Sequence, residues 1–365
     1  YRRASAEQAR WAGIHRSHES IRQLVVKEGQ RIKEQQERRI QGAEIAAFKG
    51  MAEEPAEPGL PYENPVVYVE ADSTYIAVQR HRRSGTGMKR RPYRRRPRKA
   101  EVKMGIVYSG HEDRYRSGVS GQQRLKEKQV YVSMGEPGGS FMKKFSILCE
   151  MTHKICAAAR VIVGGDGASW IKEGMKDYFV NGAYVLCKYH LNRALKRALG
   201  YHTELEPQIR RMLKRDQIMA CRERLTRIIE NGRQLSGRQK KKLKQLRSYI
   251  TANAEGINAL ERMKEEMNPA ERCLIRHTGA IEGNVDKVIA QRMKGKGMSW
   301  SIRGAESMLQ VISKRTNDEW ESWWVQERDR KITVSDADYR ALEVVSFWRK
   351  QERGGTVSVP AGMPA

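Results

Sequence analysis

The sequence predicts an α/β fold in which a mixed β-sheet is flanked by helices. Short apolar runs between residues 66 and 187 have the length and composition of strands, and helical segments separate the later runs. Charged sequence without a convincing strand, from residue 190 to about 266, predicts a long helical region beside the sheet. The chain has 365 residues and 39% hydrophobic content, enough to bury a substantial core.

The N-terminal 50 residues are predicted to be helical because they are rich in Ala and charge and lack Pro. Gly13 ends a first helix, and Ser17 can cap a second. Two helices joined by a tight turn leave two interpretations open, a helix-turn-helix and a plain helical scaffold. Residues 51–65, with four Pro and four Glu, predict a linker.

Three strands are predicted next, at residues 66–69, 75–79 and 102–108. Residues 80–99, between the second and third strands, hold eleven Lys or Arg and no acidic residue. A charge run is usually a solvated surface, but eleven like charges repel one another, which favours a nucleic-acid contact here. The predicted DNA contacts in this stretch are Arg82, Arg83, Lys89, Arg90, Arg91, Arg94, Arg95 and Arg96.

Strands and helices alternate in the following part of the chain. A helix is predicted over residues 140–159, a buried strand over 160–165, a helix from about Ser169 and a strand over 184–187. After the helical region, residues 279–292 predict a further helix that carries Glu282. A Trp-rich helix around residues 320–324 and a loose C-terminal tail complete the chain.

The net charge of +27 and the pI near 10.0 indicate a polyanionic partner, without defining an activity. Five scattered Cys residues suit a reducing compartment rather than a disulfide framework. No apolar stretch approaches the length of a transmembrane helix, and no signal peptide is visible. We therefore expect a cytoplasmic, nucleoid-associated protein. Because the chain starts at Tyr1, we also expect it to be a fragment.

Acidic residues follow two of the predicted strands, Asp72 after the first and Asp166 after the strand that ends at residue 165. Sites in open α/β sheets collect at strand ends, where side chains leave the core. Carboxylate oxygens there suit Mg²⁺, and paired ions can promote displacement at phosphorus. Each Asp taken alone has a simpler interpretation, since Asp72 suits a turn and Asp166 suits a helix cap.

Three segments together carry a resemblance to a known family. They are VYVEADSTYIAVQ around Asp72, VIVGGDGASWIKEG around Asp166 and GAIEGNVDKVIAQRMKGKGMSWSIRGAE around Glu282. These segments resemble the Asp-Asp-Glu motifs of RNase H-like transposases. Their sequences are most similar to those of bacterial insertion-sequence transposases of the ISLre type, which are relatives in fold of the Mutator-like group. In that family the first Asp lies on the first strand, the second follows the fourth strand, and the Glu lies on a later helix.

The resemblance implies a catalytic site and a domain order. Asp72, Asp166 and Glu282 would be catalytic and would bind two Mg²⁺ or Mn²⁺ ions. Residues 66–199 would form the first part of an RNase H-like core, 200–277 an all-helical insertion, 278–330 the second part of the core, and 331–365 a C-terminal helix and tail. The Lys and Arg clusters of the insertion would face DNA.

Some residues beside the triad are also predicted to contribute. Arg292, Lys294 and Lys296 are expected DNA contacts, and Trp300 suits either a DNA contact or the core. Cys187 and His190 resemble a Cys-x-x-His motif that several such transposases carry after the second Asp. Two ligands are two short of a zinc site, so we expect a structural pair or a DNA contact through His190.

The resemblance implies a DNA transposase that hydrolyses phosphodiesters at transposon ends and transfers strands to target DNA. Its partner would be double-stranded DNA, and synapsis of two ends implies a homodimer or a higher oligomer. Two alternatives stay open. One is a structure-specific nuclease or resolvase of RNase H type, and the other is a DNA-binding transposase remnant without catalytic activity.

Overall fold

The computed structural model describes residues 1–13, 15–48, 66–79, 98–113, 123–179, 181–202, 204–232, 234–295 and 297–329. The chain divides into two compact units, Tyr1–Lys33 with Arg303–Ala365, and Glu34–Ile302. The predicted linker of residues 51–65, nearly all of the basic stretch, and the C-terminal tail lie outside the described residues. Every residue of the predicted triad belongs to the second unit.

A five-stranded mixed sheet with the order β5-β2-β1-β6-β7 is the framework of this unit. Its strands are β1 (Val66–Val78), β2 (Arg98–Tyr108), β5 (Gln129–Met134), β6 (Arg160–Gly165) and β7 (Gly182–Leu186). β2 is antiparallel to both β1 and β5, whereas β6 runs parallel to β1 and to β7. A separate hairpin consists of β3 (Gly110–Asp113) and β4 (Gln123–Lys126). The predicted α/β class and mixed sheet are confirmed.

β1 differs from the sequence-based expectation of two short strands, because it is continuous over 13 residues. Residues Asp72 to Thr74, which suit a turn in isolation, pair in register with Met104 to Val102 of β2. The strand is buried from Val66 to Asp72, and its residues from Ser73 to Tyr75, together with Ala77, are partly or fully exposed. The long partner strand supplies hydrogen bonds that local sequence cannot reveal, so tertiary pairing overrides the turn preference.

Side chains alternate between the two faces of β1. Val67, Val69 and Ala71 belong to the main buried cluster, together with Phe141 and Phe145 of α3 (Gly138–His153). Gly105, the partner of Ala71, has no room for a side chain because a Cβ there would lie 2.4 Å from the Phe145 ring. Tyr68, Glu70 and Asp72 must therefore occupy the opposite face.

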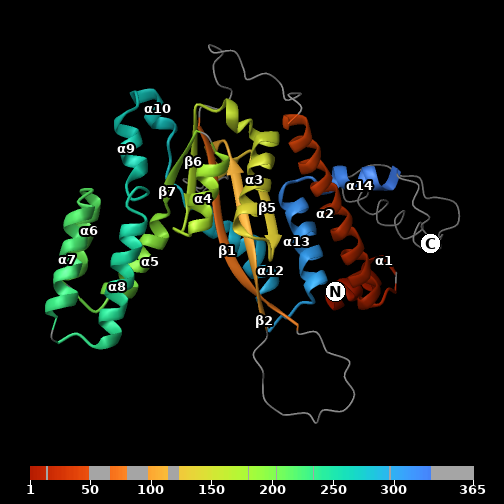
Figure 1. Ribbon diagram of the computed structural model, residues 1–365. Coiled ribbons are helices and arrows are strands. Elements are labelled where there is room, and N and C mark those ends of the chain that lie inside the picture. The colour runs from red at the N-terminus through yellow and green to blue at the C-terminus, as the bar shows by residue number, and fades with distance from the viewer. Residues whose placement is uncertain are drawn as a thin grey trace, which may run out of the picture. The chain divides into compact units, whose positions relative to one another are not determined.

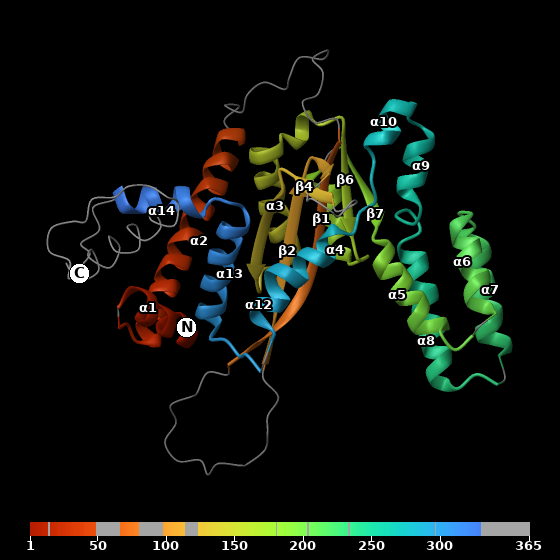
Figure 2. The same cartoon turned by 180° about the vertical axis from the view of Figure 1, so that it is seen from behind.

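Helices cover both faces of the sheet. α3 and α4 (Ser169–Tyr178) pack on one face, in front of the sheet in Figure 1. A helix formed by α11 (Ala280–Asn284), the π-helical segment η2 (Val285–Ala290) and α12 (Gln291–Met293) packs on β1. Its last part lies in front of the opposite face in Figure 2.

Between β7 and α11 the chain is helical, as predicted. The helices are α5 (Lys188–Leu199), α6 (Leu205–Lys214), α7 (Ile218–Asn231), α8 (Gly237–Ala252), α9 (Ala259–Glu265) and α10 (Pro269–Leu274). Buried residues such as Leu195, Leu225 and Leu246 join the same cluster as the sheet core. α8 begins with a capping box in which Ser236 and Gln239 bond each other's backbone. The helices from α5 to α8 therefore share one buried core with the sheet.

The first unit contains α1 (Arg2–Ala12), the N-terminal part of α2 (His18–Phe48), α13 (Ile302–Thr316) and α14 (Trp320–Asp329). Gly29 of α2 lies against the backbone of Ser307, where a Cβ would come within 2.3 Å of the Ser307 carbonyl oxygen. The Ser307 hydroxyl donates to the carbonyl of Val26 at 3.1 Å. Among the described residues, no helix combines the length and apolar composition needed to cross a membrane.

Candidate metal centre

Asp72 lies within β1 and is 8% exposed. Its Oδ1 atom accepts a hydrogen bond from the Ser73 backbone amide at 2.7 Å. β1 and β6 are parallel and pair Glu70 with Gly164. Asp72 lies two residues beyond Glu70 on β1, and Asp166 lies two residues beyond Gly164, directly after the end of β6. The first two acidic residues are thus neighbours because of strand register.

Asp166 follows β6 directly and begins the turn into α4. Its Oδ1 accepts from the amide of Ala168 at 2.8 Å, which is the bond of an Asx-turn; the N-cap of α4 is Ala168, so the helix-cap interpretation of Asp166 is wrong. The Tyr249 hydroxyl of α8 donates to the Asp166 backbone carbonyl at 2.7 Å. Gly167 has a φ of 99°, and a Cβ there would lie 2.7 Å from the Asn253 side chain. The helices after β7 therefore help to hold this turn.

Glu282 lies in the first turn of α11, the helix that packs on β1. Its Oε1 atom lies 2.9 Å from Nδ1 of His190. His190 lies in the first turn of α5, which follows β7. Because β7 is parallel to β6, it brings His190 to the same edge of the sheet as Asp166.

His190 is the centre of the cluster. Ligand atoms of Asp72, Asp166 and His190 all lie within 4.8 Å of one another, and so do those of Cys187, His190 and Glu282. Cys187 is buried, and its amide donates to the carbonyl of Gly165 at 2.9 Å. The structure thus gathers the three predicted acidic residues around one imidazole, although Asp72 and Glu282 are 210 positions apart in the sequence.

The surroundings of Asp72 and His190 raise the pKa of both groups. Burial raises the pKa of Asp72 to about 6, and the charges of Glu282 and Asp166 add to this effect. For His190, burial alone would lower the pKa, but Cys187, Glu282 and Asp72 together outweigh it and raise the pKa to about 10. His190 is therefore protonated at neutral pH, and its positive charge offsets part of the acidic charge.

The donor set fits a hard divalent cation. Three carboxylates and an imidazole converge, and the facing Glu282 Oε1 and His190 Nδ1 atoms are buried without an aligned hydrogen-bond partner among the described residues. Oxygen-rich sets of this kind suit Mg²⁺ or Mn²⁺. The additional thiol and imidazole would suit a softer ion, but the carboxylates dominate the set. Asp72, Asp166 and Glu282 could hold the ions, with His190 beside them.

Two of the predicted DNA contacts can be placed. Lys294 is exposed and its ammonium group donates to the Thr74 hydroxyl on β1, close enough to Asp72 for the two charges to interact. Arg292 is also exposed, and its guanidinium donates to the Lys287 carbonyl. Lys296 lies outside the described residues. So do the eight predicted contacts of the basic stretch, which are Arg82, Arg83, Lys89, Arg90, Arg91, Arg94, Arg95 and Arg96.

Trp300 joins the segment after α12 to the end of β1. Its amide donates to Ala77 at 3.0 Å, its carbonyl accepts from Gln79 at 2.8 Å, and its indole donates to the Met293 carbonyl at 3.0 Å. These contacts support the structural interpretation of Trp300, although its side chain is only half-buried. A contact of Trp300 with DNA remains a prediction.

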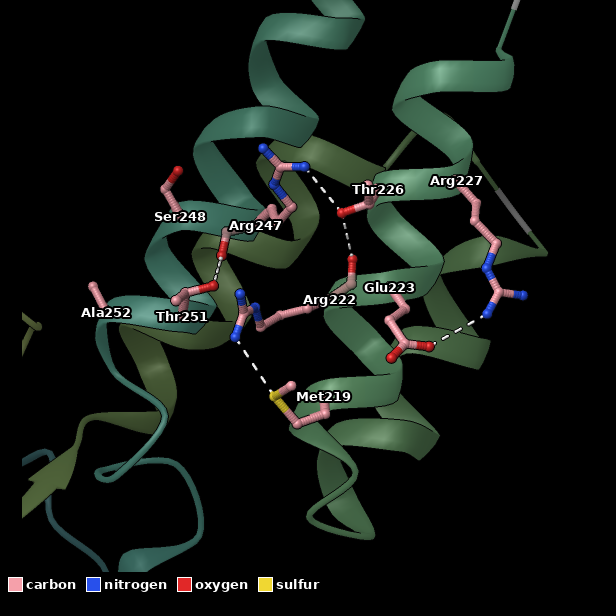
Figure 3. Close-up of a pocket in the computed structure, with 9 residues that line it drawn as sticks. All are labelled: Met219, Arg222, Glu223, Thr226, Arg227, Arg247, Ser248, Thr251 and Ala252. Atoms are coloured by element: carbon pink, nitrogen blue, oxygen red, sulfur yellow. Dashed lines mark hydrogen bonds and ion pairs between the residues drawn. The ribbon is translucent and has the colours of Figure 1, made fainter.

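A basic hollow lies between α7 and α8 (Figure 3). It has a volume of about 800 Å³ and contains none of the triad residues. Arg247 donates to the Thr226 hydroxyl at 2.9 Å, whereas Arg227 pairs with Glu223 at 3.3 Å. The expectation that basic clusters of this helical region face DNA remains a prediction.

Glu70 is the principal residue that the sequence did not single out. It is fully buried on β1 and accepts hydrogen bonds from Tyr108 and from the first amides around α11. The available signal was the two-residue period of Tyr68, Glu70 and Asp72 within an otherwise apolar run, which puts all three side chains on one face.

Comparison with protein families gives a match to an uncharacterised protein family, UPF0236, over residues 1–328. The chain belongs to this family. A UPF0236 protein of Caldanaerobacter subterraneus subsp. tengcongensis is 25% identical over 268 residues, which are 72% of this chain and 50% of that protein. A UPF0236 protein in the vanSb 3′ region of Streptococcus gallolyticus is 22% identical over 271 residues, 71% of this chain and 51% of that protein.

This UPF0236 chain spans about half the length of the curated relatives it matches. The Caldanaerobacter relatives share a further feature. The name of one joins four gene designations, and the name of another, 23% identical over 280 residues, joins eleven.

Proposed function

We propose that this UPF0236 chain is the catalytic part of a DNA transposase with an RNase H-like core. It would hydrolyse phosphodiesters at transposon ends and join the freed ends to target DNA. Its cofactor would be Mg²⁺ or Mn²⁺ and its partner double-stranded DNA in the bacterial nucleoid, with two or more copies in the synaptic complex. The convergence of Asp72, Asp166 and Glu282 around His190 is the observation that carries this proposal.

The positions of the acidic residues in the fold support the proposal. Asp72 lies on the first strand of the five-stranded sheet, Asp166 follows its fourth strand in chain order, and Glu282 lies on a later helix. This is the arrangement that the resemblance to the Asp-Asp-Glu transposases implies. It depends on elements from three distant parts of the sequence, so chance proximity of single acids explains it poorly.

The names of the relatives give independent support. A protein whose name joins four or eleven gene designations within one organism is specified at several places in a genome. A DNA element that copies or moves itself produces this pattern, whereas a resolvase with a single cellular task does not require it. The observation therefore favours a transposase over the nuclease alternative.

The chemistry needs no protein nucleophile. When bound, the divalent ions would supply activation of the attacking oxygen and stabilisation of the leaving oxygen during displacement at phosphorus. Asp72 lies on β1 and Asp166 directly follows the adjacent parallel strand β6, so these two residues would give the rigid half of the site. Glu282 would complete it from the helix side. His190, positively charged at neutral pH, would hold Glu282 in place through their ion pair.

The direct test is a reaction of the full-length protein with a plasmid that carries the DNA repeats flanking its gene. In Mg²⁺ or Mn²⁺ we expect cleavage at the repeat ends and joined products, both abolished by EDTA. Asp72→Asn, Asp166→Asn and Glu282→Gln should each reduce cleavage by at least about a thousandfold, because each removes a charged ligand.

Asp177→Asn is a matched control, because Asp177 is an exposed acid on α4 outside the cluster. It should cleave as the unchanged protein does. Nicking without joining, regardless of the repeats, would support the nuclease alternative. Cleavage that survives all three substitutions would show that the site lies elsewhere.

A further inference from the structure

Glu70 is an acidic residue with no exposed surface, next to the proposed site but outside its ligand set. Its Oε2 atom accepts from the amides of Gly279 at 2.8 Å and Ile281 at 3.1 Å. Its Oε1 accepts from the Tyr108 hydroxyl at 2.6 Å and the Ala280 amide at 3.3 Å. Both oxygens of the Glu70 side chain thus accept hydrogen bonds, and three of the four donors are backbone amides of one segment.

That segment is the start of α11. The first amides of a helix lack partners within the helix and normally receive a cap from a nearby Ser, Thr, Asp or Asn. The residue before α11 is Gly279, whose φ is 128° and which offers no side-chain cap. The cap comes instead from Glu70, about 210 positions earlier in the chain. Helix capping and attachment to the sheet are therefore one interaction.

Two further features bring the same segment onto the sheet. The Tyr68 hydroxyl, on the same face of β1, accepts from the Arg276 amide at 2.7 Å. Gly164 of β6 pairs with Glu70, and a Cβ there would lie 3.1 Å from both Glu70 Cγ and Thr278 Cβ. The absence of a side chain at residue 164 gives residues 276–281 room to approach.

Glu70 consequently links two of the predicted ligands. Asp72 is two residues from Glu70 on the same face of β1, and Glu282 follows Ile281, whose amide Glu70 binds. We propose that Glu70 is a positioning residue that fixes the start of α11 on β1 and thereby sets the distance between the carboxylates of Asp72 and Glu282. The consequence for metal binding rests on the proposed function, whereas the attachment of α11 does not.

A general role in stability is the competing explanation. A buried carboxylate is an expensive way to stabilise a core, because its removal from water costs free energy that apolar packing would not. A positioning role explains why a buried acid is present at this place despite that cost. Its directional hydrogen bonds to three successive amides fix the start of α11 in one place. The two explanations differ in whether loss of Glu70 acts through Glu282.

The experiment uses the full chain with Glu70→Gln and Glu70→Ala, each also combined with Glu282→Gln. Hydrogen exchange of the Gly279, Ala280 and Ile281 amides and calorimetric Mn²⁺ affinity are measured on each folded variant. We expect faster exchange at these amides. Mn²⁺ affinity should fall by about 10- to 100-fold in the otherwise unchanged protein, as for loss of a group that orients a ligand. With Glu282→Gln present, Glu70→Gln should change affinity by less than about twofold.

Ser146→Ala is the control, because it removes another buried polar side chain that bonds the Lys143 carbonyl in α3. It should alter neither readout. Glu70→Gln keeps the shape and part of the hydrogen bonding, so it serves if the Ala variant does not fold. Unchanged amide exchange, or equal losses of Mn²⁺ affinity with and without Glu282, would overturn the proposal. If the unchanged protein binds no Mn²⁺, the proposed function fails, and amide exchange alone decides whether Glu70 holds α11.

Discussion

Asp72 is placed where it could bind a cation, but its burial beside other acidic residues lowers the stability of the folded chain when its carboxylate is ionised. Its burial raises its pKa to about 6, and Glu282 and Asp166 nearby add to the effect. A carboxylate binds a cation only after it loses its proton, so the same surroundings oppose ionisation and concentrate negative charge for a cation. Sites that hold like charges in this way are typically functional rather than stabilising.

The first prediction concerns Asp72→Asn in the presence of EDTA. The folded-state pKa of Asp72 is above its ordinary value of 3.8, so its stabilising contribution is complete below pH 3.8 and is lost as the pH rises through about 6. The Asn variant avoids this loss. At pH 7.5 its free energy of unfolding should be higher by up to about 3 kcal/mol, and the difference should vanish near pH 3.5.

Denaturant unfolding at several pH values measures this difference. Asp177→Asn, on the exposed surface of α4, should show no such pH-dependent gain. A lower free energy of unfolding for Asp72→Asn at pH 7.5 would contradict this account. It would mean that favourable interactions of the Asp72 carboxylate outweigh its burial and its repulsion by the neighbouring carboxylates. Added Mn²⁺ should reverse the order, because the unchanged protein alone keeps the complete ligand set.

At the scale of elements, the turn after β6 depends on the helical region that follows the sheet. Gly167 has a φ of 99°, and the side chain of Asn253, just after α8, fills the space where a Cβ would lie. Gly167→Ala should therefore strain the turn and displace Asp166. We expect a loss of about 1–3 kcal/mol in the free energy of unfolding and weaker Mn²⁺ binding.

Gly237→Ala is the matched control for this substitution. Gly237 begins α8, and a Cβ there would meet nothing within 4 Å. The substitution should be neutral or should stabilise the helix slightly, as replacement of Gly in a helix usually does. Equal stability and Mn²⁺ affinity of the Gly167 and Gly237 variants would show that the turn tolerates a side chain.

The elements differ in how well the sequence predicts them. The predicted strand over residues 160–165 is correct to the residue, and the helix predicted from about Ser169 begins there, because an apolar run, a turn and a helix start follow one another clearly. The strand β5 and the β3–β4 hairpin were not predicted. Their short sequences carry weak patterns, and partners such as Lys103 opposite Ser133 emerge only from the fold.

The candidate site shows the same division. Asp72, Asp166 and Glu282 were identified from local sequence patterns and from the resemblance of the surrounding segments to a known family. The structure brings these residues around His190. The distance between His190 and Glu282 had no sequence signal, because it depends on how β7 and α11 are placed. Glu70 was not identified because a buried acid in a strand is a signal only when its amide donors, 209 to 211 positions away, are known.

For the whole molecule, the net charge of +27 should dominate binding to DNA. Each phosphate contact releases a counterion, so affinity should fall steeply with salt. Replacement of Arg95 and Arg96 by Ser should reduce the slope of log affinity against log salt concentration by up to about 2, since each contact contributes roughly 0.9. Fluorescence anisotropy on a duplex of arbitrary sequence measures this slope.

Arg124→Ser with Lys126→Ser is the matched control. Both residues are exposed on the β4 hairpin strand, beside Glu112 and Glu127 respectively. Two charges are removed in each case, but the slope should change only for the pair in the basic stretch. An equal change in both variants would mean that total charge, not the basic stretch, governs binding.

The central claim is that Asp72, Asp166 and Glu282 form one divalent-metal centre. Anomalous diffraction from crystals of the protein grown with Mn²⁺ tests it most directly, because the signal locates the ions independently of activity. We predict one or two manganese peaks within about 2.0–2.4 Å of carboxylate oxygens of these residues, lost in crystals of Asp166→Asn. Manganese bound elsewhere, or none between the three carboxylates at saturating Mn²⁺, would contradict the metal centre and the transposase built on it.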